Sequence, residues 1–142
     1  MILSEQQLRE RFESGESAVR ALRALADNVG ATPITDYTWE LSGERGRIRQ
    51  LRRATLIGLV GLTEEAAVNG GGWSLRVQVV SWKATADIAI VWHETPADGY
   101  WEMHLGDGHP QRIRPENVAS GMAFVAAALA AVATAGPGRT GG

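Results

Sequence analysis

Two histidines and a glutamate near the centre of the chain are the residues best suited to chemistry. A loop typical of hairpins, Pro96–Gly99, separates His93 from Glu102 and His104. The predicted pairing places His93 opposite Glu102, with His104 on the same face of the hairpin. Two imidazoles and one carboxylate can ligate Zn²⁺ or non-haem iron, or exchange protons. One hypothesis is therefore a small ligand-binding or metal-dependent enzyme centred on these three residues.

The opposing hypothesis is a non-catalytic surface that holds a protein partner. The three residues lack the spacing of a motif such as H-E-x-x-H, and unspecific His/Glu pairs are common between strands. Tyr100 is expected on the same face, with an exposed tryptophan and an arginine beside it from the preceding strand. Exposed aromatic and arginine side chains are typical of interface hot spots. We favour this hypothesis, with a partner-binding set of Arg76, Trp82, His93, Tyr100, Glu102 and His104 and no metal.

A cluster of arginines forms a second candidate surface. Five guanidinium groups within nine residues could contact phosphates or an acidic partner. The cluster contains no stacking aromatic residue, and the chain carries 14 basic against 16 acidic residues, for a net charge of −2. Nucleic acid is therefore not the expected partner. We predict at most a local anion or acidic-partner patch at Arg45, Arg47, Arg49, Arg52 and Arg53.

Composition excludes several classes of protein. The 142-residue chain contains no cysteine, which excludes disulfides, thiolate zinc sites, iron–sulfur clusters and cysteine nucleophiles. All basic residues but Lys83 are arginine, which indicates a GC-rich bacterial or phage genome. The first residues lack the basic and apolar regions of a secretory signal, so we expect a cytoplasmic protein. No cofactor is expected, and small-molecule binding is left open.

One uncharged segment has the length of a membrane span. Residues 118–135 contain no charged residue but are mostly alanine, which contributes little transfer free energy into hydrocarbon. Alanine is also the best helix former. We predict a buried helix of a soluble domain and no membrane contact.

The remaining segments must position these surfaces. Residues 4–29 have the apolar spacing of an amphipathic helix, which Ser14-Gly15-Glu16-Ser17 can break in two. Residues 34–41 indicate a strand. Residues 47–68 fit either a helix or a buried strand, and we favour the helix because Asn69-Gly70 is a clean stop signal. Residues 73–84, 87–95 and 100–105 alternate like an antiparallel meander.

These elements predict an α+β fold, in which an antiparallel sheet of three to five strands is packed by N-terminal and C-terminal helices. Residues 1–135 are expected to form one domain and residues 136–142 a flexible glycine-rich tail. The expected function is that of an interaction module or small assembly subunit, of structural, immunity or antitoxin type. Such a module would bind a partner protein or itself through a sheet face.

Overall fold

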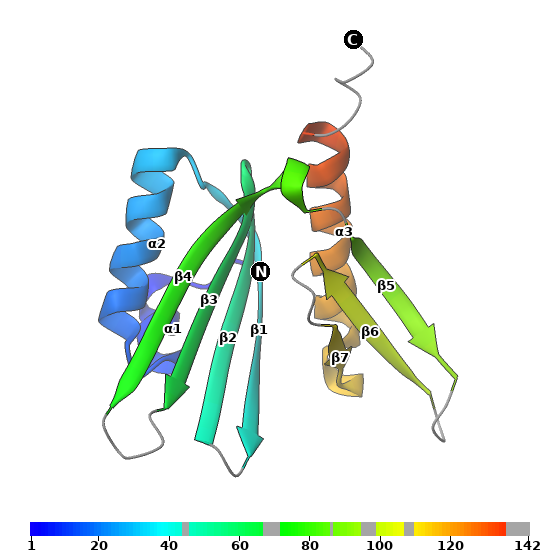
Figure 1. Ribbon diagram of the computed structural model, residues 1–142, viewed down its shortest axis with the longest axis horizontal. Helices are drawn as coiled ribbons and strands as arrows, with labels where there is room; N and C mark the ends of the chain where they lie inside the picture. The colour runs from blue at the N-terminus through cyan, green and yellow to red at the C-terminus, as the bar shows by residue number, and fades with distance from the viewer. Residues whose placement is uncertain (44–45, 67–71, 86, 95–98, 107–109, 136–142) are drawn as a thin grey trace.

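In the residues that the structure describes, the fold combines three α-helices and two short 3-10 helices with seven strands that pair antiparallel. Figure 1 shows how these elements are arranged. The computed structural model describes residues 1–43, 46–66, 72–85, 87–94, 99–106 and 110–135. The predicted α+β class is confirmed. The predicted tail lies outside the described residues. The elements in chain order are α1 (Glu5–Arg11), α2 (Gly15–Val29), β1 (Pro33–Gly43), β2 (Gly46–Thr55), β3 (Gly58–Ala66), β4 (Trp73–Ser81), η1 (Trp82–Ala84), β5 (Ile88–His93), β6 (Tyr100–Leu105), β7 (Gln111–Ile113), η2 (Pro115–Asn117) and α3 (Val118–Ala135).

The strands form two separate sheets. Sheet A has the order β1-β2-β3-β4, and sheet B has the order β5-β6-β7. The α1–α2 pair covers one face of sheet A, and α3 contacts strands of both sheets on the other side (Figure 1). The predicted meander over residues 73–105 is therefore wrong for its first strand. β4 pairs with β3 in sheet A, and the chain passes through η1 to β5 in sheet B.

The N-terminal helices form as predicted, with a break between them. Ser4 and Gln7 cap α1 reciprocally, which satisfies two backbone donors at its start. The chain leaves the helix at Phe12, and α2 begins at Gly15. A side chain at Gly15 would collide with the backbone of Arg9, so the close crossing of the two helices requires glycine there. Their apolar residues pack on Leu51, Val60 and Leu62 of sheet A.

A buried carboxylate joins the helix break to sheet A. Glu64 of β3 has no exposed surface, and it accepts hydrogen bonds from the backbone N–H groups of Glu13 and Ser14 at 3.2 and 2.6 Å. The Ser14 hydroxyl and Arg49 Nη1 also donate to it, the latter at 3.3 Å. Four donors compensate for the burial of the charge.

The segment 47–68 is two strands rather than the favoured helix. Leu51 in β2 and Leu62 in β3 are directly paired and both lie against the N-terminal helices. The turn between the strands is closed by Thr55 Oγ1, which donates to the Gly58 carbonyl at 2.7 Å and accepts from the Gly58 N–H at 3.1 Å. A side chain at Gly58 would collide with the carbonyl of Val80 in β4. Gly58, a residue type that is unfavourable inside a helix, is thus required by the sheet.

The second core lies between sheet A, sheet B and α3. Phe124, Val125 and Ala128 of α3 are buried there against Tyr37 and Met103. The opposite side of α3 is exposed, so the prediction of a buried helix holds for one side only. The span Pro115–Thr134 is the single one in the described residues long and apolar enough to cross a membrane, and core helices of soluble proteins share that composition.

Candidate functional site

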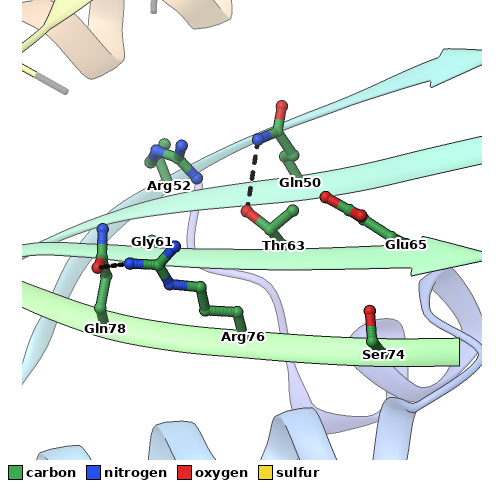
Figure 2. Close-up of a pocket in the computed structure, with 8 residues that line it drawn as sticks. All are labelled: Gln50, Arg52, Gly61, Thr63, Glu65, Ser74, Arg76 and Gln78. Carbon is green, nitrogen blue, oxygen red and sulfur yellow. Dashed lines mark hydrogen bonds between the residues drawn. The ribbon is translucent and has the colours of Figure 1, made fainter. Parts of the chain in front are cut away.

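The inner face of sheet A carries a polar hollow next to the second core (Figure 2). Strand alternation directs the apolar residues of β4 toward α2 and its polar residues to the opposite face. α3 contacts β1 and β2 on that side, and β3 and β4 carry the open half. The hollow measures about 490 Å³ and is lined by polar residues and one glycine, namely Gln50, Arg52, Gly61, Thr63, Glu65, Ser74, Arg76 and Gln78.

Gly61 forms the floor of this hollow. It pairs with Arg52 on one side and with Gln78 on the other, so one row of the sheet lacks a central side chain. The Arg52 guanidinium lies across the gap, since a Cβ at Gly61 would come within 3.3 Å of Arg52 Nη1. Arg52 is 7% exposed and stacks over the Trp39 ring at 5.2 Å. The glycine therefore makes room for a nearly buried guanidinium.

The hollow contains the groups needed to bind a polar ligand. Arg76 donates to Gln78 Oε1 at 3.0 Å, and both side chains project over β4 beside Gly61 (Figure 2). Thr63 accepts from Gln50 Nε2 at 3.4 Å across the neighbouring pair of strands. None of the lining residues is a histidine, aspartate or cysteine. The arrangement supports binding of an anionic group and offers no nucleophile with a partner base.

The outer face of sheet B gathers the histidines and the glutamate. His93 and His104 each place Nε2 on the same oxygen of Glu102, at 3.1 and 2.9 Å. His93 also stacks on Tyr100, with ring centroids 4.8 Å apart. Arg112 of β7 lies over the Tyr100 ring, with its guanidinium carbon 4.2 Å from the ring centroid. The sequence reasoning missed Arg112, although alternation in Gln111–Ile113 places it on this face.

The two histidines lower the pKa of Glu102. Partial burial of this carboxyl favours its neutral form and would raise its pKa, whereas the hydrogen bonds from His93 and His104 favour the carboxylate. The net result is that the pKa of Glu102 lies below its usual value of 4.5. The side chain of Glu102 is 19% exposed, and those of His93 and His104 are 38% and 32% exposed. The face therefore carries a carboxylate at neutral pH in a partly solvated network.

The hairpin register differs from the predicted one by two residues, yet the face is preserved. His93 pairs with Tyr100 and Val91 with Glu102, so His93 and Glu102 are diagonal neighbours. A shift of one residue would have moved one strand's side chains to the opposite face, whereas a shift of two leaves them in place. Within the described residues, no group of three His, Cys, Asp or Glu side chains has the arrangement of a metal site.

Two members of the predicted partner-binding set lie elsewhere. Arg76 belongs to the hollow of sheet A, because β4 is not a strand of sheet B. The prediction of an exposed Trp82 is wrong, since this residue is 2% exposed and its Nε1 donates to the Thr55 carbonyl at 2.8 Å. The strand ends at Ser81, and the short helix that follows turns the indole into the second core.

The predicted arginine patch is divided between the two faces of β2. Arg53 is buried and forms two hydrogen bonds with Asp36, at 2.7 and 2.8 Å. Arg49 pairs with Glu64, and Arg47 pairs with Glu40 at 2.7 Å. Strand alternation separates these from Arg52, which lies on the inner face, and Arg45 lies outside the described residues. The four described arginines do not form a common basic surface.

Comparison with known protein families, curated proteins and solved structures finds no match to this chain.

Proposed function

We propose that this protein is a non-catalytic interaction module, which holds a protein partner on the outer face of sheet B. A cytoplasmic location in a bacterial or phage system is part of the proposal. The observation that supports it is the stacked group of Arg112, Tyr100 and His93, in which Arg112 is exposed and the two rings are partly exposed. Rigid aromatic and arginine side chains on a sheet are typical of interface hot spots.

The chemistry of the face favours an acidic segment as the partner. Glu102 is already engaged by His93 and His104, whereas the guanidinium of Arg112 has only the tyrosine ring beneath it among the described contacts. A carboxylate of a partner can pair with that guanidinium while the aromatic rings exclude water from the contact.

Affinity purification from the native host tests the proposal when wild type and variants are compared. Tyr100→Ala with Arg112→Ala should lose a stoichiometric partner, because truncated hot-spot residues cost about 2 kcal/mol or more in binding. Arg20→Ala, which removes an exposed arginine of α2, is the matched control. Partner capture that survives the double substitution would exclude this face, provided that circular dichroism shows an unchanged fold.

A second candidate function is the binding of a small polyanion in the hollow of sheet A. The specific observation is the placement of Arg52 and Arg76 around the glycine floor. Calorimetry with citrate as the probe should show heat of binding that Arg76→Ala abolishes and Arg20→Ala preserves. Absence of binding at millimolar citrate would remove this candidate.

A further inference from the structure

The two edges of sheet A differ in how they are protected. β1 begins with Pro33, and its register with β2 shifts between Pro33 and Thr35. The chain's own N-terminus covers that edge, because the Asp36 N–H donates to the Met1 carbonyl at 3.1 Å and the Leu3 N–H donates to the Asp36 carboxylate at 2.8 Å. Proline, irregular register and an added segment are the usual means of preventing edge-to-edge pairing.

β4, at the opposite edge, has none of these features. Its nine residues contain no proline, and its pairing with β3 runs without a shift from Trp73 to Ser81. In the part of the chain that the structure describes, no backbone hydrogen bond joins β4 to any strand but β3. The Ser81 carbonyl at its end accepts from Thr85 Oγ1 at 2.9 Å. A long, regular edge of this kind is a template for another strand.

The side chains of β4 indicate that a second copy of the same strand fits this edge. Leu75, Val77 and Val79 are only half-buried beneath α2, so apolar surface remains at the edge. The sequence from 75 to 79 is nearly symmetric about Val77, with Leu75 matching Val79 and Arg76 matching Gln78. In an antiparallel pair centred on Val77, every apolar residue of this group therefore meets an apolar residue.

The polar face matches in the same register. Arg76 would lie opposite Gln78 of the partner subunit, and Gln78 opposite the partner's Arg76. Within one chain Arg76 already donates to Gln78, so the two side chains are suited to each other chemically. No like charges oppose each other across the pair, since Arg76 is the only charged residue of β4.

We propose that the protein forms a homodimer by antiparallel pairing of β4 with β4 of a second copy, which joins two sheets A into one eight-stranded sheet. Because the pairing is isologous, each contact occurs twice about a twofold axis, except that between the two Val77 residues, which lies on the axis. The polar hollows of the two copies would then lie side by side along the shared edge. This proposal is independent of the partner surface on sheet B.

Charge changes at Gln78 provide the test, with sedimentation equilibrium as the measurement. Gln78→Glu places two carboxylates opposite two arginines and should tighten the dimer about tenfold in Kd, whereas Gln78→Arg should weaken it by a similar factor. Gln50→Glu and Gln50→Arg are matched controls, since Gln50 lies on the same inner face but on β2, away from the edge. The controls should leave Kd unchanged.

The outcomes separate the proposal from its rivals. Opposite shifts for the two Gln78 variants, with none for the Gln50 variants, support pairing at β4. A monomer at every concentration up to about 1 mM overturns the proposal. So does a dimer that is insensitive to charge at Gln78, because its contact must then use another surface. Loss of the dimer on Tyr100→Ala would assign self-association to sheet B instead.

Discussion

Removal of the Glu64 carboxylate should destabilise the protein more than any change at the neighbouring glutamate. Glu64 connects β3 to the helix break through Glu13 and Ser14, and it also accepts a hydrogen bond from Arg49 of β2. Glu64→Ala leaves these donors without their acceptor in a region that water reaches poorly. Glu65→Gln, one residue further on, alters an exposed side chain of the inner face and is the matched control.

The magnitude follows from what each donor loses. Removal of one partner of a buried ion pair costs about 3–5 kcal/mol. Arg49 is 14% exposed and keeps Glu13 and Glu40 within 3.8 and 4.0 Å, so its guanidinium is not left without a carboxylate. The lower end of the range, about 3 kcal/mol, is therefore expected for Glu64→Ala. A loss of that size is a large part of the roughly 5–15 kcal/mol that stabilises a domain.

Urea unfolding followed by circular dichroism measures this effect. The midpoint should fall for Glu64→Ala with the slope m unchanged, whereas Glu65→Gln should remain within about 0.5 kcal/mol of wild type. Hydrogen exchange should also quicken at the amides of Glu13 and Ser14, which lose their acceptor directly. If Glu64→Ala and Glu65→Gln changed stability equally, the buried carboxylate would not be holding the helix break to the sheet.

Two further predictions concern the second core and sheet B. Trp82→Phe keeps an aromatic ring in place but leaves the Thr55 carbonyl without its indole donor. We expect the free energy of unfolding, measured with urea, to fall by about 1–3 kcal/mol. A fall of less than about 0.5 kcal/mol would indicate that water replaces the lost hydrogen bond. Because the pKa of Glu102 is lowered on folding, its contribution to stability is present above its unfolded pKa near 4.5 and is lost as pH falls through its lower folded value. Glu102→Gln should therefore flatten the dependence of unfolding free energy on pH in that acidic range, and an unchanged slope would show that His93 and His104 contribute nothing through this carboxylate.

The sequence predicted the local elements best where one signal dominated. The Ser4 and Gln7 capping pair and the break at Gly15 are encoded within a few residues, so the N-terminal helices could be predicted. Residues 47–68 could not, because their apolar spacing fits either a helix or a buried strand, and the structure has two strands there. The strands are favoured because their apolar residues are buried against the N-terminal helices and because Gly58 approaches Val80 closely. Both are contacts between segments that are distant in the sequence.

The histidine-bearing face shows the same division. Strand alternation alone determined that His93, Glu102 and His104 share a face, because side-chain direction repeats every two residues and survives a register shift of two. Which strands join that face was decided by the tertiary structure. The turn at η1 sends β4 to one sheet and β5 to another, which separates Arg76 from the histidines and buries Trp82. The periodicity of a strand predicts the face on which a side chain lies, whereas the residues that surround it there depend on how distant segments pack.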